Sequence, residues 1–253
     1  MRAARALLSR SVGWNGTPSN GTRDSGKPTS DGERGKAHDE RGEACAFPIR
    51  QPRCQTERVT ARGRFLVLEG IDGSGKTEQT RRLAAWLEQR GHRVVSTREP
   101  TDGPHGRRYR AWARGEFEAS PDDVLEMFLA DRREHLSRVV LPALVRGEIV
   151  VCDRYKHSTL AYQAAQGIDR ARLRALFVTP EFPEPDLVLW LRLPVAQALL
   201  RMGANATERF ERAEFLERVD AEYARLGLEA IDASLPPDRV ERAIRERVER
   251  ALA

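Results

Sequence analysis

Residues 70 to 77 combine glycines, a lysine and a hydroxyl group at a spacing that binds phosphate. Their sequence, Gly70-Ile-Asp-Gly-Ser-Gly-Lys76-Thr77, satisfies the pattern G-x-x-x-x-G-K-[ST]. Glycines let the backbone curl until successive N–H groups face phosphate oxygens, and the start of a helix adds its positive dipole end. We expect Lys76 to reach the β- and γ-phosphates of a nucleoside triphosphate and the Thr77 hydroxyl to bind Mg²⁺. The residues of this phosphate loop are Gly70, Ile71, Asp72, Gly73, Ser74, Gly75, Lys76 and Thr77.

Two arginines and an aspartate follow apolar strands elsewhere in the chain. Arg98 and Arg154 should both emerge at the carboxyl edge of a parallel sheet, where doubly wound folds bind ligands. Two guanidinium groups at that edge suit a phosphate monoester, although a surface salt bridge is the alternative for either one. Asp153 ends the strand before Arg154 and is placed to hold Mg²⁺ through water.

Strands alternate with helices from residue 64 onward. The run Phe65-Leu-Val-Leu68 precedes the phosphate loop and is typical of a strand buried on both faces. The pattern predicts strands at 65–68, 94–95, 149–152, 187–191 and 228–231 and helices at 77–89, 107–115 and 122–146. This alternation indicates an α/β fold of the P-loop NTPase type, with a five-stranded parallel sheet, helices on both faces and a short lid.

The chain divides at about residue 62. Residues 1–62 are rich in Gly, Ser, Pro and charged residues and are predicted to be a disordered extension, whereas 63–253 are predicted to form the domain that contains the phosphate loop. A targeting segment and a mis-assigned start, with true initiation near Val59, are the alternatives for the extension.

Charge and composition exclude several kinds of partner. The formal net charge is +5, but residues 1–58 alone hold 11 Lys and Arg against 7 Asp and Glu, so the domain is nearly neutral and no nucleic-acid partner is expected. No apolar run reaches the roughly 18 residues that span a bilayer. Cys45, Cys54 and Cys152 show no metal-ligand spacing, which favours a reducing, cytoplasmic location.

The phosphate loop alone does not separate kinases from other P-loop proteins. A GTPase would need an Asn-Lys-x-Asp signature late in the chain, which is absent, and a large ATPase would need more sequence. A small kinase that uses ATP and Mg²⁺ remains.

Several further motifs occur in order, and with them the chain resembles the thymidylate kinase family over residues 64–250. They are Glu69 to Thr77, Arg98-Glu-Pro100, Phe128-Leu-Ala-Asp-Arg132, Asp153-Arg-Tyr155, Ser158 to Gln163, Pro185-Asp-Leu-Val188 and Ile231-Asp-Ala-Ser234. The resemblance implies ATP-dependent phosphorylation of dTMP by a homodimer.

The resemblance also implies roles for single residues. Phe128 would stack on thymine and Arg132, four residues on along the same helix face, would bond its edge, although Phe128 could also be a core residue. Tyr162 would lie beneath the deoxyribose and Asp72 would bind its 3′-hydroxyl, with Thr159 at the same site. Arg98 and Arg154 would hold the acceptor and transferring phosphates.

No general base is needed for this reaction, because a phosphate monoester has a second pKa of about 6 and is already ionised at pH 7. Catalysis then needs alignment and positive charge, from Lys76, Arg98, Arg154 and a lid at 201–212. Arg209 is the first choice in the lid, ahead of Arg201 and Arg212.

Three departures from the family pattern accompany the match. Thr101 to Gly106 replace the usual Gly-Gly-Thr, Glu78 replaces a hydroxyl residue, and Arg192 stands where an acidic or amide residue is common. Two rival functions stay open: a related kinase for another nucleoside monophosphate or a deoxynucleoside, and a non-catalytic nucleotide-binding scaffold.

Overall fold

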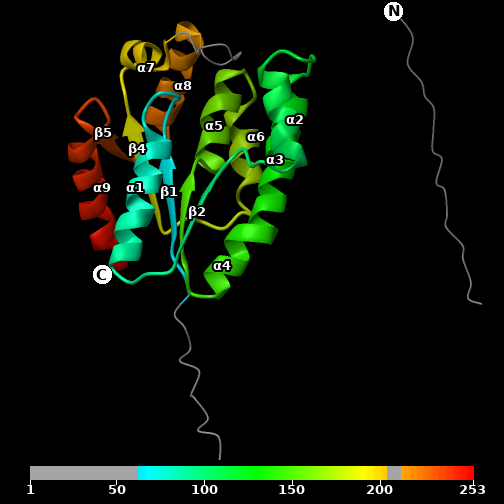
Figure 1. Ribbon diagram of the computed structural model, residues 1–253. Coiled ribbons are helices and arrows are strands. Elements are labelled where there is room, and N and C mark those ends of the chain that lie inside the picture. The colour runs from blue at the N-terminus through cyan, green and yellow to red at the C-terminus, as the bar shows by residue number, and fades with distance from the viewer. Residues whose placement is uncertain (1–61, 204–211) are drawn as a thin grey trace, which may run out of the picture. The chain divides into compact units, whose positions relative to one another are not determined.

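The computed structural model describes residues 62–203 and 212–253, and these form a parallel α/β fold built on one five-stranded sheet (Figure 1). The order across the sheet is β2-β3-β1-β4-β5, and every neighbouring pair is parallel. The strands are β1 Phe65–Glu69, β2 Val94–Arg98, β3 Ile149–Asp153, β4 Leu187–Arg192 and β5 Glu229–Asp232. The predicted five-stranded parallel sheet is therefore confirmed.

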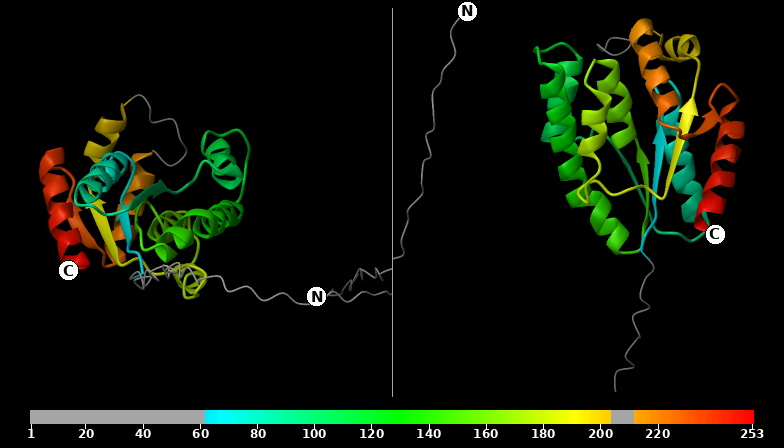
Figure 2. Two further views of the ribbon diagram at one scale, coloured as in Figure 1. Left: turned by 60° about the horizontal axis from the view of Figure 1, so that its bottom comes forward. Right: turned by 180° about the vertical axis from the view of Figure 1, so that it is seen from behind.

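Helices cover both faces of the sheet. Figures 1 and 2 show α1 and α9 side by side on one face, with α3, α4, α5 and α6 on the other. The helices are α1 Lys76–Gln89, α2 Pro104–Ala113, α3 Pro121–His135, α4 Leu141–Val145, α5 Lys156–Ala165, α6 Arg170–Leu176, α7 Val195–Met202, α8 Ala213–Arg225 and α9 Pro237–Leu252. Within the described residues, no helix is both long and apolar enough to cross a membrane.

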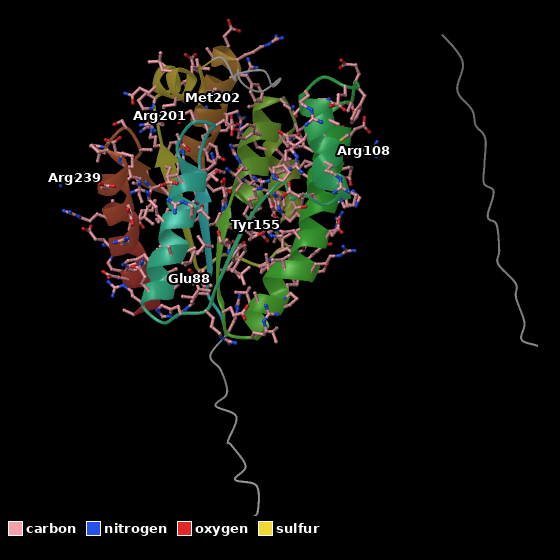
Figure 3. The ribbon with its side chains drawn as sticks, viewed as in Figure 1. Glu88, Arg108, Tyr155, Arg201, Met202 and Arg239 are labelled. Carbon is pink, nitrogen blue, oxygen red and sulfur yellow. The ribbon has the colours of Figure 1, made fainter. Side chains whose placement is uncertain are left out.

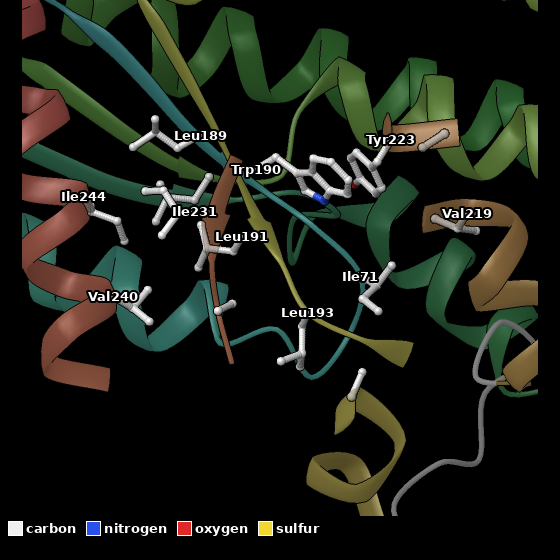
Figure 4. Packing of buried hydrophobic residues seen from close by; sticks show 14 of the residues in the cluster. Ile71, Leu189, Trp190, Leu191, Leu193, Val219, Tyr223, Ile231, Val240 and Ile244 are labelled. Carbon is white, nitrogen blue, oxygen red and sulfur yellow. The ribbon is translucent and has the colours of Figure 1, made fainter. Parts of the chain in front are cut away.

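The buried strands divide their side chains between two apolar layers. Leu66 and Leu68 of β1 belong to the layer that includes α1 and α9, whereas Phe65 and Val67 belong to the layer beneath α3 and α4. Successive strand residues point to opposite faces, so a strand covered on both sides must be apolar throughout. In the first layer Trp190 of β4 stacks on Tyr223 of α8, with ring centroids 5.9 Å apart (Figure 4).

The segment predicted as one helix at 122–146 is helical from Pro121 to Val145, but it is not one regular α-helix. A π-helical turn, η1 Leu136–Val140, separates α3 from α4. Pro142 has no N–H to donate to the preceding turn, and a π-turn just before it is one way to accommodate that loss. The bounds of α5, α6, α7, α8 and α9 were not predicted from the sequence.

Candidate active site

The phosphate loop joins β1 to α1 at the carboxyl edge of the sheet, at the top of Figure 1. Asp153 at the end of β3 is in register with Leu68 of β1 and with Arg98 of β2. Three strand ends that lie far apart in sequence therefore meet beside the loop, as predicted from the motifs.

Two glycines of the loop cannot be replaced without moving the backbone. A Cβ on Gly73, whose φ is 77°, would lie 2.7 Å from the carbonyl oxygen of Ala198. A Cβ on Gly70, at φ 145°, would lie 2.6 Å from the carbonyl oxygen of Leu191. Positive φ and close backbone contact together explain why only glycine fits at these positions.

Lys76 is folded back onto the loop. Its Nζ donates to the carbonyl oxygen of Ile71 at 2.8 Å, and the side chain is buried. Burial and the neighbouring Arg154 guanidinium lower the pKa of Lys76 to about 8, although Asp72 and other carboxylates act in the opposite direction. The loop thus holds a poorly solvated cation that a phosphate anion would stabilise.

Thr77 and Asp153, the two predicted magnesium residues, are in contact. The Thr77 hydroxyl donates to Asp153 Oδ2 at 2.6 Å. The other carboxylate oxygen, Oδ1, is buried and has no hydrogen-bond partner among the described residues. Hydroxyl and carboxylate oxygens are ligands that Mg²⁺ accepts, and Mg²⁺ usually takes only one or two from the protein while substrate phosphates and water supply the rest.

Glu78 does not present a free negative charge to the loop. Its carboxylate accepts hydrogen bonds from Arg81 and Arg82 at 2.9 and 2.6 Å, and these bonds lower its pKa to about 2. Glu78 lines a cavity of about 500 Å³ beside α1 that also includes Thr77 and Asp153. Arg81 and Arg82 therefore offset the negative charge that Glu78 brings in place of the family's hydroxyl residue.

A second cavity, of about 220 Å³, opens next to the loop and contains three arginines. We call it the arginine pocket; its lining residues are Asp72, Arg98, Glu99, Pro100, Tyr109, Arg110, Phe128, Arg154, Ser158 and Tyr162. Five of the predicted substrate residues are thus brought together: Asp72, Arg98, Phe128, Arg154 and Tyr162. Arg110 was not found from the sequence, since it lies on a helix among several other arginines.

Asp72 connects the phosphate loop to the arginine pocket. Arg154 Nη2 donates to its Oδ1 at 2.7 Å, and the Tyr162 hydroxyl donates to its Oδ2 at 3.2 Å. Burial opposes ionisation of Asp72, but Arg154 and Lys76 outweigh it and lower the pKa to about 2. Asp72 is therefore ionised at neutral pH, and it fixes Arg154 between the two sites.

Glu69, a charged residue in an otherwise apolar strand, holds Arg154 in place indirectly. Its buried carboxylate accepts from the backbone N–H groups of Tyr155 and Ser158 and from the hydroxyls of Ser158 and Tyr223. Burial raises the pKa of Glu69 despite these bonds. Arg154 itself has a φ of 71°, a left-handed conformation rare for a non-glycine residue, so this turn needs such support. A glutamate next to the loop glycine was the available signal for this role.

Arg132 lies behind the arginine pocket and is only 1% exposed. Its Nε donates to Glu99 at 2.8 Å and its Nη2 donates to Thr159 at 3.0 Å. Nη1 is buried and has no hydrogen-bond partner within the described part of the chain. Phe128 lines the pocket and packs on Tyr109, with the two ring centroids 4.5 Å apart. Phe128 is therefore at the pocket wall, whereas Arg132 is buried behind it.

Gln163 shows the same unusual feature and was not singled out from the sequence. It is completely buried, and neither its amide oxygen nor its amide nitrogen has a hydrogen-bond partner among the described residues. Gln163 follows Thr159 by one turn of α5, so the two side chains share a helix face. Buried polar atoms without partners are rare in folded proteins, and a ligand is one explanation.

The lid is only partly described, since Arg209 lies outside the described residues. Arg201 lies in the last turn of α7, close to the phosphate loop (Figure 3), where its Nη1 is 3.5 Å from the carbonyl oxygen of Gly73. Arg212 lines another cavity together with Phe215 and Arg218. Arg201 and Arg212 were the second choices for the lid after Arg209, and of these two Arg201 is the one that lies near the loop.

A parallel sheet with a complete phosphate loop, facing a second pocket that contains three arginines, defines a nucleotide kinase of the P-loop class. Residues 68–244 match the family model described as thymidylate kinase. The chain belongs to the thymidylate kinase family.

Curated relatives agree with this assignment over most of the chain. A thymidylate kinase of Xanthomonas campestris pv. campestris is 44% identical over 78% of this chain and 88% of its own length. A thymidylate kinase of Desulfotalea psychrophila is 38% identical over 75% and 96%, respectively. A probable thymidylate kinase of Pyrococcus horikoshii is 43% identical over 62% and 78%.

Proposed function

We propose that this protein transfers the γ-phosphoryl group of ATP to dTMP, giving ADP and dTDP. The observation that carries the proposal is the arginine pocket, because it opens beside the phosphate loop and shares Asp72 with it. A guanidinium group can donate two parallel hydrogen bonds to phosphate oxygens. The pocket residues Arg98, Arg110 and Arg154 therefore suit the phosphate of an acceptor nucleotide. Membership of the family supports thymidylate as that nucleotide.

The residues of the chain act by alignment and charge. The acceptor oxygen is already ionised at pH 7, so no side chain has to remove a proton. Lys76 would leave the Ile71 carbonyl and turn its ammonium to the β- and γ-phosphates. Arg154, held by Asp72, would stabilise the negative charge on the transferring group between the two nucleotides. Arg209 stays a prediction for the lid.

Thr77 and Asp153 would hold Mg²⁺ at the phosphates of ATP. Thr77 Oγ1 is 2.6 Å from Asp153 Oδ2, and Asp153 Oδ1 has no hydrogen-bond partner within the described residues. When bound, the ion neutralises phosphate charge and orients the transferring group.

Buried side-chain atoms of Arg132 and Gln163 that have no partner in the described part of the chain support recognition of a thymine base. Thymine presents a carbonyl, an N–H and a second carbonyl along one edge. Arg132 Nη1 can donate to a carbonyl, and the Gln163 amide can both accept from the N–H and donate to a carbonyl. Phe128 would offer a ring face for stacking, and Tyr162, which lines the same pocket, would contact the sugar.

The direct test is ADP release from ATP with dTMP, dUMP, UMP, CMP, GMP, AMP and thymidine offered in turn. We expect dTMP to give the highest kcat/KM. Turnover with another acceptor but not with dTMP would change the substrate, and no turnover with any of them would favour a nucleotide-binding scaffold.

A pair of variants links the activity to the arginine pocket. Arg98→Ala should raise the KM for dTMP by about tenfold through loss of a charge-assisted phosphate contact. Arg114→Ala is the matched control, because this exposed arginine pairs with Glu116 and does not line the pocket.

We also propose a homodimer that works in the cytoplasm. The family resemblance supports the dimer, and light scattering on the purified protein tests it. The buried free thiol of Cys152 is compatible with a reducing compartment. Fractionation of native cells tests the location.

A further inference from the structure

A buried hydrogen-bond chain runs from β2 to α3 behind the arginine pocket. His135, 3% exposed, lies three residues after Arg132 on α3. Its Nδ1 is 2.9 Å from Glu99 Oε1, and its Nε2 is 2.7 Å from Thr97 Oγ1. An ionised carboxylate can only accept, so Nδ1 must carry the proton and donate to Glu99. The Thr97 hydroxyl, which can donate or accept, pairs with Nε2 on the other side of the ring.

Glu99 connects His135 to Arg132, since each of its two carboxylate oxygens contacts one of these residues. Its Oε2 lies 2.8 Å from both Nε and Nη2 of Arg132, and Nη2 also donates to Thr159 at 3.0 Å. The guanidinium also lies over the rings of Tyr155 and Phe177, at 5.1 and 5.4 Å from their centroids. These contacts fix the plane and direction of the guanidinium and leave only Nη1 without a partner in the described part of the chain.

We propose that His135 is a positioning residue for the acceptor base. By occupying Oε1 of Glu99, it leaves only Oε2 to Arg132, whose Nε and Nη2 both lie 2.8 Å from that oxygen. Nη1, which has no partner among the described residues, can then donate to a base carbonyl. This inference rests on the proposed phosphorylation of dTMP.

The consequence of removing His135 follows from the geometry of carboxylate and guanidinium groups. A Glu99 carboxylate that loses its Nδ1–H donor is left with a buried acceptor that has no partner, which is costly. It would turn to take two parallel bonds from Arg132, the geometry that such pairs favour. Arg132 would then rotate away from Thr159 and withdraw its donor from the base.

Three substitutions separate positioning from a general loss of structure. His135→Phe removes both contacts. In His135→Asn the amide nitrogen can take the place of Nδ1 and still donate to Glu99. In His135→Gln the amide reaches the Nε2 position and contacts only Thr97.

Steady-state kinetics with dTMP and with dCMP, together with the melting temperature of each variant, give the readout. We expect His135→Phe to raise the KM for dTMP about tenfold with kcat within about twofold of wild type. It should also narrow the preference for dTMP over dCMP, whose exocyclic amine offers a donor where thymine offers an acceptor. His135→Asn should recover most of both losses and His135→Gln should not. If His135→Phe does not fold, His135→Gln against His135→Asn makes the same comparison.

Unchanged KM and base preference in His135→Phe, or equal values in the Asn and Gln variants, would overturn the positioning role. A lower kcat and melting temperature with an unaltered KM would reduce His135 to a core residue. Wild-type activity is the separate check on the proposed function. If wild type fails to phosphorylate dTMP, calorimetric binding of dTMP by the same variants still decides the role of His135.

Discussion

ATP binding should be accompanied by proton uptake above pH 8, because the free protein holds Lys76 with a lowered pKa. In the free protein, burial and Arg154 lower the pKa of Lys76 to about 8. The phosphates of bound ATP bring negative charge to this ammonium and must raise its pKa again. Only the protonated form binds the phosphates well, so the affinity for ATP should fall as the pH rises through 8.

The size of the effect follows from that pKa. At pH 7 nearly all of the free protein carries the charged lysine, whereas at pH 9 only about a tenth does, so the Kd for ATP should weaken about tenfold between these values. The terminal phosphate of ATP is already ionised there, since its last pKa lies near 6 to 7. The stability of the unliganded protein has the opposite pH dependence. Between about pH 8 and 10.5 the unfolded chain binds more protons at Lys76 than the native state does, so this group raises the free energy of unfolding as the pH rises through that range.

Calorimetry in two buffers of different ionisation enthalpy measures the proton uptake directly, and we expect about 0.9 proton per ATP at pH 9. Lys76→Arg is the control, because a guanidinium stays charged throughout this range and its weaker binding should not depend on pH. The reasoning is refuted if wild type takes up no proton at pH 9, or if Lys76→Arg shows the same pH dependence.

Three further substitutions test other parts of the site. Thr77→Val should weaken activation by Mg²⁺ at least tenfold while leaving dTMP affinity intact, as judged by a Mg²⁺ titration of kcat; an unchanged titration would remove Thr77 from the metal site. Asp102→Asn should lower the KM for dTMP a few-fold. In the unliganded protein the exposed Asp102 carboxylate bridges Arg98 and Arg110, where it would compete with the acceptor phosphate. A raised KM would mean that Asp102 positions the two arginines instead. Glu69→Ala should destabilise the fold by roughly 3 kcal/mol or more, because it leaves two backbone N–H groups and two hydroxyls without their buried acceptor. Urea unfolding measures this loss, and a change under about 1 kcal/mol would contradict this account.

Amino-acid type and local spacing determined the phosphate loop. Glycines at 70 and 73 need positive φ, and the strand before them and the helix after them follow from apolar runs and periodicity that lie within a few residues. The alternation of strands and helices likewise fixed a parallel α/β sheet, since connections between parallel strands require crossovers. These features depend on near neighbours in the chain, and the sequence is sufficient for them.

The tertiary structure decided which distant side chains meet. Strand order puts β3 next to β1, and so brings Asp153 to Thr77 across 76 positions of sequence. It also brings His135 to Glu99, and it leaves Arg132 and Gln163 with buried atoms that have no partner among the described residues. None of these relations has a sequence period, because burial and side-chain direction depend on the packing of α3 and α5 against the sheet. Hydrogen-bond partners inside a fold are chosen by that packing, since a buried polar group must find its partner among the groups that packing brings within reach.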